Sequence, residues 1–252
     1  MILVTGDTHG DFERLIFDRD LEISSDDYLI VCGDFGGIWS DSDRERQRNA
    51  LLSRRLPCPL LWVDGNHENY DALSEYSVTE WCGGKVQIIE KNIIHLMRGQ
   101  VYTIEGQKIF TFGGAASHDI DSGILEPDDP NFYQKRRMLD RSYAMYRINQ
   151  FSWWKEEMPS DEEMAEGLRN LEAHDWQVDY ILSHCAPTSL LGILGNGLFK
   201  PDRLTDYLET IRQQCSFKHW YFGHYHEDRN LLPKFTVLYE GIKEVVRYQN
   251  DT

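Results

Sequence analysis

The sequence predicts a mixed α/β fold with a parallel front half and an antiparallel middle. Two patterns support this prediction. A strand–loop–helix unit occurs three times within residues 1–76, and this repeat is typical of a parallel sheet. Four short apolar segments follow between residues 86 and 112, with spacings that suit antiparallel strands. At 252 residues, the chain is long enough to bury a substantial core.

The front half contains three predicted strands, at residues 1–5, 28–32 and 59–63. Each strand is a short apolar segment that ends in a polar loop containing glycine. A helix is expected after each one. Asp11 can cap the first helix, and Ser42 with Glu45 resembles a capping box that starts the second. The third helix is expected over residues 70–76.

The middle of the chain contains four strand candidates, at residues 86–89, 93–96, 101–104 and 108–112. Glu105 and Gly106 suit a hairpin turn between the last two. In the back half, Ser160 with Glu163 forms another capping-box pattern, which predicts a helix. The remaining elements are a strand at 178–182, a helix at 201–214, a strand at 220–222 and two strands within 231–248.

Residues 115–158 fit neither periodic pattern. The segment carries the basic run Lys135-Arg136-Arg137 and the pair Trp153-Trp154. A stretch of this length inside a compact domain is usually functional or mobile. Two interpretations have equal weight: a partly helical surface segment, and a lid whose basic and aromatic residues meet the substrate. Residues 113–117 are interpreted as a hairpin exit in preference to a site segment. Because no linker divides the chain, residues 1–252 are predicted to form one domain.

The composition excludes several classes of protein. The chain carries 26 Lys and Arg against 42 Asp and Glu, which gives a formal net charge of −16. This charge disfavours broad binding to the phosphates of nucleic acids or membranes. Hydrophobic residues make up 41% of the chain, which is too many for a disordered protein of this charge. No apolar stretch reaches the roughly 18 residues of a membrane span.

Cysteine usage and the N-terminus both predict a cytoplasmic protein. The five cysteines are widely spaced and form no CxxC motif, which argues against a disulfide framework and against a thiolate zinc site. The N-terminal sequence MILVTGDTHG has neither a basic leader region nor a cleavage site. Reduced thiols are therefore expected.

Eight polar side chains directly follow predicted strands, in tight loops that contain or adjoin glycine. They are Asp7, His9, Asp34, Asn66, His67, His184, His224 and His226. Ligands of open α/β sheets bind beyond the carboxyl ends of the strands, so these loops are expected to converge. Each residue alone has an ordinary structural explanation, but five strand ends with the same chemistry favour a shared site. The other histidines, for which no such context exists, are His95, His118, His174 and His219.

The chemistry of these side chains predicts a metal centre. Carboxylate, amide oxygen and imidazole form a donor set that suits Mn, Fe, Zn or Mg. Eight such groups exceed the needs of one ion. Two divalent ions that share a bridging carboxylate would use seven groups and leave one imidazole for proton transfer. We therefore expect a pair of divalent metal ions, with Mn favoured.

Five ordered motifs make the chain resemble the calcineurin-like metallophosphoesterase family. They are Gly6-Asp7-x-His9, Gly33-Asp34, Gly65-Asn66-His67-Glu68, His184 and Gly223-His224-x-His226. The motifs span nearly the whole chain. The resemblance implies a four-layer α/β/β/α sandwich of two mixed β-sheets flanked by helices. It also implies hydrolysis of a phosphate ester by a hydroxide held between two metals.

The resemblance assigns a role to each site residue. The first metal would be bound by Asp7, His9 and His226. The second would be bound by Asn66, His184 and His224. Asp34 would bridge both metals. His67 would act as a general acid or as an electrostatic stabiliser of the transition state. Glu68 and Asp64 are candidates for orienting these groups, and the motif glycines are expected where the backbone passes close to metals or neighbouring loops.

One motif departs from the protein Ser/Thr phosphatases of this superfamily. Those enzymes extend the second motif to Gly-Asp-x-x-Asp-Arg-Gly, whereas Gly37 and Ile38 occupy the Asp and Arg positions here. The departure disfavours phosphoprotein hydrolysis, and a small phosphodiester or nucleotide-type substrate is favoured. Arg136 or Arg137 is a candidate for replacing the lost phosphate contact.

Two alternative functions are weighed against this one. A nuclease of the same fold is disfavoured by the net charge of −16 and by the lack of a long basic stretch. A non-catalytic metal-binding scaffold for partner proteins is disfavoured because every metal position and His67 are present. The expected partner is a small-molecule phosphate ester, without a membrane or nucleic acid, and the sequence carries no signal for an oligomeric state.

Overall fold

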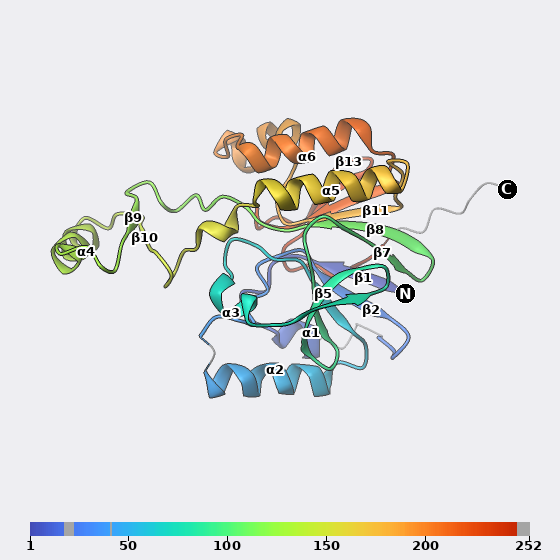
Figure 1. The fold of residues 1–252 in the computed structure, drawn as a ribbon, viewed down its shortest axis with the longest axis horizontal. Coiled ribbons are helices and arrows are strands. Elements are labelled where there is room, and N and C mark those ends of the chain that lie inside the picture. The colour runs from blue at the N-terminus through green and yellow to red at the C-terminus, as the bar shows by residue number, and fades with distance from the viewer. Residues whose placement is uncertain (18–22, 41, 246–252) are drawn as a thin grey trace.

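The computed structural model describes residues 1–17, 23–40 and 42–245. Two β-sheets pack face to face, and helices cover the outer face of each sheet (Figure 1). This arrangement is the four-layer α/β/β/α sandwich that the family resemblance implies. None of the helices in the described ranges is long and apolar enough to cross a lipid bilayer.

The first sheet has the strand order β15-β1-β2-β3-β6-β5-β4. Its strands are β1 (Ile2–Thr5), β2 (Tyr28–Val31), β3 (Leu60–Trp62), β4 (Val78–Trp81), β5 (Gly84–Glu90), β6 (Ile93–Leu96) and β15 (Lys243–Glu244). The centre, β1-β2-β3-β6, is parallel, as the repeated strand–loop–helix pattern predicts. Antiparallel pairs add β15 at one side and β5 and β4 at the other.

The second sheet has the strand order β13-β14-β12-β11-β8-β7. Its strands are β7 (Gln100–Ile104), β8 (Gln107–Phe112), β11 (Tyr180–Ser183), β12 (His219–Phe222), β13 (Arg229–Leu232) and β14 (Phe235–Val237). The strands β8, β11, β12 and β14 are parallel to one another. The hairpin between β7 and β8 turns at Glu105 and Gly106, whose φ values of 49° and 74° are those that a tight hairpin requires.

The helices divide between the two outer faces. The first sheet is covered by α1 (Glu13–Phe17), α2 (Asp43–Arg55) and α3 (Tyr70–Ser74). The second is covered by α5 (Asp161–Ala173) and α6 (Arg203–Gln214). Short 3₁₀ turns occur at η1 (Lys155–Glu157), η2 (Thr188–Ile193) and η3 (Gly195–Gly197).

The predicted helix caps are present, with one difference. Ser160 and Glu163 form the complete capping box of α5. Ser42 accepts a hydrogen bond from the amide of Glu45, but the Glu45 carboxylate instead accepts bonds from the amides of Trp39 and Ser40, each at 2.9 Å. Glu45 therefore holds the loop in front of α2 rather than the cap residue.

Alternating side chains of the central strands supply both apolar layers. In β2, Ile30 faces the core between the sheets, whereas Leu29 and Val31 face the helices. In β11, Tyr180 and Leu182 face the other sheet, and Ile181 faces α6. Since both faces of each sheet are covered, the strands are continuous apolar runs.

Three sequence predictions need correction. β4 was not predicted, because Val78–Trp81 is an exposed edge strand with little apolar pattern. The middle strands form antiparallel hairpins, but β6 and β8 also pair in parallel with β3 and β11. The C-terminal segment contains three strands rather than two within the described residues, and its predicted end at 246–248 lies outside them.

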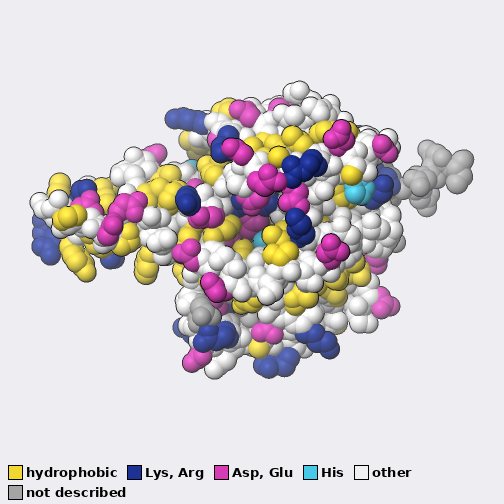
Figure 2. All heavy atoms as spheres, in the orientation of Figure 1, with side chains coloured by type: hydrophobic (Ala, Val, Ile, Leu, Met, Phe, Trp, Pro, Cys, Tyr) yellow, Lys and Arg dark blue, Asp and Glu magenta, His cyan; other side chains and the backbone are white. Residues whose placement is uncertain are grey.

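The chain leaves the sandwich between Ser117 and Lys155 as an arm, defined here as residues 118–154 (Figure 1). The arm contains β9 (Ile124–Leu125), α4 (Phe132–Arg141) and β10 (Arg147–Ile148), and β9 pairs with β10. No residue of α4, all of which are described, is buried. Basic and apolar side chains lie exposed along the arm (Figure 2), among them Tyr133 and Tyr143.

Candidate metal centre

Five loops meet at one edge of the sandwich, where the parallel strands of both sheets end. Three loops follow β1, β2 and β3, and two follow β11 and β12. Hydrogen bonds join loops from different sheets, and two of them anchor buried residues of the centre. His184 Nδ1 donates to the carbonyl oxygen of Cys32 at 2.9 Å, and the amide of His224 donates to Asp7 Oδ1 at 3.0 Å. The loops therefore converge, as the strand-end pattern predicts.

One group of ligand-type atoms comes from Asp7, His9 and His226. The Nε2 atoms of the two histidines lie 3.1 Å apart. Asp7 Oδ2 lies 3.2 Å from His226 Nε2 and 3.8 Å from His9 Nε2. These three atoms are close enough to share one cation.

A second group surrounds His184. Its Nε2 atom lies 3.2 Å from Asn66 Oδ1 and 3.4 Å from Asp34 Oδ1. The ring of His224 lies next to it, with ring centroids 5.0 Å apart. The other oxygen of Asp34, Oδ2, lies 3.9 Å from Nδ1 of His9. Ligand-type atoms of Asp7, Asp34 and His184 are also close enough to share one cation, so Asp7 takes part in both groups.

The hydrogen bonding of these residues fits a bound cation. Asp7 Oδ2 is buried and makes no well-aligned hydrogen bond within the described residues, although His226 Nε2 lies 3.2 Å away as an ion-pair contact; a buried carboxylate oxygen that is incompletely paired is costly. The carbonyl of Cys32 can only accept, so His184 Nδ1 must carry a proton. In the neutral ring, the Nε2 lone pair then faces the oxygens of Asn66 and Asp34. Lone pairs that converge in this way need a cation between them.

The charges in the centre shift several pKa values. Burial alone would raise the pKa of Asp34, but His184, His67 and His9 hold it below its usual range. Burial alone would lower the pKa of His184, but Asp34 and Asp7 raise it to about 10. Burial and the charge of His184 lower the pKa of His224. In the metal-free centre, a proton on His184 therefore occupies the place that suits a cation.

Four residues of the centre have left-handed backbone conformations. They are His9, Asp34, His224 and His226, with φ values of 47°, 45°, 68° and 51°. Such a conformation costs a residue other than glycine about 1–3 kcal/mol. Local hydrogen bonds hold it in place, such as the 2.7 Å bond from the amide of His9 to the carbonyl of Asp34. The loops are therefore bent in order to present these side chains.

Two motif glycines allow the loops to approach one another. A Cβ atom at Gly65 would overlap Asp34 Oδ1, and a Cβ atom at Gly33 would overlap the ring of His184. Both positions confirm the predicted close approach of the backbone to neighbouring loops.

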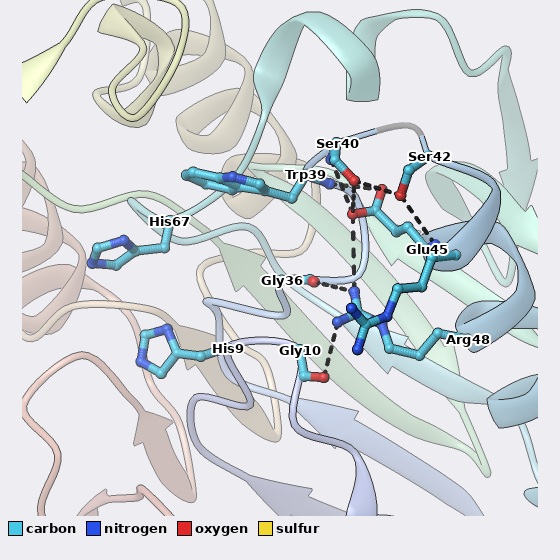
Figure 3. A pocket seen from close by; sticks show the side chains of 10 residues that line it. His9, Gly10, Gly36, Trp39, Ser40, Ser42, Glu45, Arg48 and His67 are labelled. Atoms are coloured by element: carbon cyan, nitrogen blue, oxygen red, sulfur yellow. Dashed lines mark hydrogen bonds and ion pairs between the residues drawn. The ribbon is translucent and has the colours of Figure 1, made fainter.

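His67 and His9 border a cavity of about 780 Å³ (Figure 3). The amide of His67 donates to Asp34 Oδ1 at 2.8 Å, which ties this residue to the centre. The Trp39 ring extends toward His67, and Arg48 lines the opposite side of the cavity. Burial lowers the pKa of His67, so its ring is neutral near pH 7 and offers one N–H donor.

The two candidate orienting residues act differently. The buried carboxylate of Glu68 accepts hydrogen bonds from the amides of Phe35 and Gly36, at 2.7 Å and 3.4 Å, and so holds the loop that carries Asp34. Asp64 contacts none of the predicted ligands. It accepts hydrogen bonds from Arg98 Nε at 2.7 Å and from the Tyr70 hydroxyl at 2.9 Å, in a buried network behind the centre.

The structure brings two further residues to the centre, Ser117 and His118. Asn66 Nδ2 donates to Ser117 Oγ at 3.3 Å, so the segment at 113–117, interpreted above as a hairpin exit, borders the site at its last residue. The ring centroid of His118 lies 5.3 Å from that of His224. His118 was not among the predicted site residues because it follows no strand directly. For Ser117, the only sequence signal for a position beside the metal centre is that it lies shortly after β8.

The arginines of the site also differ from the prediction. Arg136 and Arg137 lie on α4 in the arm, and neither lines the cavity (Figure 1). The cavity is lined instead by Arg44 and Arg48 of α2. The sequence did not single these out, because an exposed helix carries arginines for many reasons.

The tryptophan pair lies at the foot of the arm. Trp154 is buried and donates from Nε1 to Asp71 Oδ2 at 2.8 Å, so it packs against the sandwich. Its ring also meets Trp39 edge-on, with centroids 5.3 Å apart. The arm therefore contacts a residue that lines the cavity.

Comparisons with known proteins place this centre in a family. The sequence profile of the calcineurin-like phosphoesterases matches residues 1–228, which include all five loops. No curated protein matches the chain significantly. One similar solved structure is phosphopantetheinyl hydrolase from Mycobacterium tuberculosis, with 17% identity, a TM-score of 0.49, and coverage of 94% of this chain and 87% of that one. The chain therefore belongs to the calcineurin-like phosphoesterase family, whose members are metal-dependent hydrolases.

Proposed function

We propose that this chain is a two-metal phosphoesterase that hydrolyses a small phosphate ester, with a phosphodiester or nucleotide-type substrate favoured. One observation carries the proposal: the Asp34 carboxylate lies between the two sets of ligand-type residues, with Oδ1 3.4 Å from His184 Nε2 and Oδ2 3.9 Å from His9 Nδ1. In this assignment the first metal would be held by Asp7, His9 and His226. The second would be held by Asn66, His184 and His224. Asp34 would be shared by both.

When bound, two divalent ions supply the Lewis acidity that activates water and neutralises phosphoryl charge. The nitrogen and oxygen donors suit Mn, Fe, Zn or Mg, and we favour Mn. The protein contributes fixed ligand positions, because strained loops and hydrogen bonds between the sheets hold them in place.

His67 is the residue that we assign to the leaving group. Hydrolysis forms a bond from water to phosphorus and breaks the bond to the leaving oxygen, which needs a proton or a hydrogen bond. His67 lies beside the centre and borders the cavity, so its ring N–H can donate to that oxygen. A donor of this kind contributes about 10²–10⁴ in rate.

The surroundings of the centre support a small ester over a phosphoprotein. The cavity of about 780 Å³ has the size of a small-molecule site. Its aromatic residue Trp39 and its arginines Arg44 and Arg48 suit a ring and an anionic group. Ile38, at the position of the phosphate-gripping arginine in phosphoprotein phosphatases, is buried and apolar.

We extend the proposal to domain organisation, the arm and cellular location. Residues 1–252 form one domain in which the excursion at 115–158 serves as a lid; the contact between Trp154 and Trp39 supports this role. We favour a cytoplasmic location. Each of the five cysteines, all within the described ranges, is a free thiol, which supports reducing surroundings.

The test is hydrolysis of p-nitrophenyl phosphate and bis-p-nitrophenyl phosphate by the Mn²⁺-loaded chain, beside Asp34→Asn and His67→Ala. We expect turnover of at least one ester, with loss in both variants. Asp34→Asn should also lose bound metal, whereas His67→Ala should keep it. The ratio of the two rates separates monoesterase from diesterase. Absence of turnover in a chain shown to hold two metals, with these esters and with nucleotides, would overturn the proposal in favour of a binding protein.

A further inference from the structure

A chain of hydrogen bonds links Asn66 to a buried carboxylate just after the arm returns to the sandwich. Asn66 Nδ2 donates to Ser117 Oγ at 3.3 Å. Ser117 Oγ donates to Glu157 Oε2 at 2.6 Å, and the amide of Ser117 donates to Glu157 Oε1 at 2.9 Å. Glu157 is only 2% exposed. A buried carboxylate therefore stands directly behind a side chain of the metal centre.

The direction of these bonds sets the orientation of the Asn66 amide. Burial raises the pKa of Glu157, and the two bonds from Ser117 act against this shift by stabilising the ionised carboxylate. The ionised carboxylate only accepts, and the hydroxyl proton of Ser117 then points at Glu157. Ser117 Oγ is then left with acceptor lone pairs toward Asn66, and the NH₂ end of the amide must face it. The oxygen of the amide consequently faces His184 Nε2, 3.2 Å away. If the amide were rotated by 180°, its NH₂ group would face His184 Nε2, and an amide NH₂ group has no lone pair to offer a metal.

We propose that Glu157 is a positioning residue that holds Asn66 in its metal-binding orientation through Ser117. The inference rests on the proposed assignment of Asn66 to the second metal. Hydrogen-bond partners of metal ligands change metal affinity by about 10–100-fold when they are lost; Ser117 is such a partner of Asn66, and Glu157 orients Ser117.

The arm is thereby coupled to the metal centre. Ser117 immediately precedes the arm, and Glu157 follows shortly after its end. Arg98 fixes the returning end by donating to the carbonyl of Glu156 at 2.8 Å, while its Nε binds Asp64 just before Asn66. A displacement of either end of the arm would therefore disturb the orientation of Asn66.

The decisive variant is Glu157→Gln, which keeps the shape of the side chain but reverses one bond. The Gln oxygen can still accept from the amide of Ser117, but its NH₂ group then faces Ser117 Oγ as a donor. The hydroxyl proton of Ser117 turns toward Asn66 and favours the wrong amide orientation. Glu156→Gln is the matched control, because Glu156 is the exposed neighbour whose side chain takes no part in the relay.

Binding of Mn²⁺ is measured by calorimetry on the full chain, and the coupled dimanganese signal by electron paramagnetic resonance. We expect Glu157→Gln to bind the second ion roughly 10–100-fold more weakly, whereas its affinity for the first ion and the thermal midpoint of the metal-free chain stay close to those of Glu156→Gln. Ser117→Ala should also weaken binding of the second ion, because it removes the hydroxyl that accepts a hydrogen bond from Asn66. This variant provides the test if Glu157→Gln does not fold.

Two results would overturn the inference, and they are distinguishable. If Asn66→Ala loses the second ion but Glu157→Gln and Ser117→Ala bind it as tightly as the unmodified chain, the relay is structural only. If Asn66→Ala itself binds two ions with unchanged affinity, the ligand assignment of the proposed function fails, and the positioning role fails with it.

Discussion

The carbonyl oxygen of Cys32 accepts a hydrogen bond from His184 Nδ1 at 2.9 Å, so a loop of one sheet fixes the tautomer of a histidine from the other. This bond leaves Nε2 of His184 toward Asp34 and Asn66. The contact exists because Gly33, next to Cys32, has no side chain in the path of the ring. The metal centre is thus also a junction between the two sheets.

Gly33→Ala should disrupt this junction. Its Cβ atom would overlap the His184 ring, and its φ of 102° disfavours any side chain. We expect weaker binding of metal and a loss of about 2–4 kcal/mol in unfolding free energy. Gly192→Ala is the control, because a Cβ there meets nothing within 4 Å. Chemical denaturation measures the stability of both variants, and metal analysis measures their bound metal. Equal stability of the two variants would show that the contact between Gly33 and His184 does not hold the sheets together.

Removal of metal should lower thermal stability markedly. The four left-handed residues and the poorly hydrogen-bonded Asp7 Oδ2 make the centre unfavourable without metal. An ion present at about 100 times its dissociation constant stabilises the folded state by roughly 2.7 kcal/mol. For a chain of this size that corresponds to about 5–10 °C per site. Calorimetric scans with and without a chelator measure the shift, and Asp34→Asn should show little of it. An unchanged midpoint would mean that the ions are not held by the folded centre.

Glu68→Ala should destabilise the loop that carries Asp34. The amides of Phe35 and Gly36 would lose their acceptor in a buried position. We expect a cost of about 2–4 kcal/mol together with weaker metal binding. Glu80→Ala, on an exposed edge strand, is the control. Denaturation midpoints that agree within error for the two variants would contradict this role.

His219 should make stability depend on pH away from the metal centre. Its Nε2 bonds to Thr236 Oγ1 at 2.8 Å, and its Nδ1 is buried without a partner among the described residues. Burial and Lys243 lower the pKa of His219 from 6.5 to about 4. The unfolded chain therefore binds a proton in this range and the folded chain does not, so stability is fully present above pH 6.5 and is lost as pH falls toward 4.

His219→Gln should remove this part of the pH dependence, roughly 1–3 kcal/mol between pH 7 and pH 4. Urea unfolding at a series of pH values measures the slope for both proteins. If the free energy of unfolding depends on pH in the same way in both proteins, groups other than His219 cause the acid sensitivity.

Much of the fold was predictable because its central strands are buried on both faces. Continuous apolar runs such as Tyr28–Val31 are visible without any partner. Val78–Trp81 was missed because an edge strand exposes its side chains and needs no apolar pattern. The parallel pairing of β6 with β3 depends on contacts distant in sequence, which local spacing does not report.

The site residues were predictable where they follow strands directly. The structure brings Asp7, Asp34 and His184 together from loops that are far apart in sequence. Ser117 and Glu157 were not predictable, since a hydroxyl and a carboxylate beside an irregular segment carry no spacing signal. Their roles depend on how the arm leaves and returns, which only the folded chain reveals.

The two ends of the arm lie next to each other, because Glu157 contacts Ser117. A segment whose ends are adjacent can change in length or sequence without shifting the register of the strands on either side. The arm is thus a module that evolution can exchange while the hydrolytic chemistry is kept. The same property makes it the natural place to graft a foreign recognition element, provided that the contact between Ser117 and Glu157 is retained.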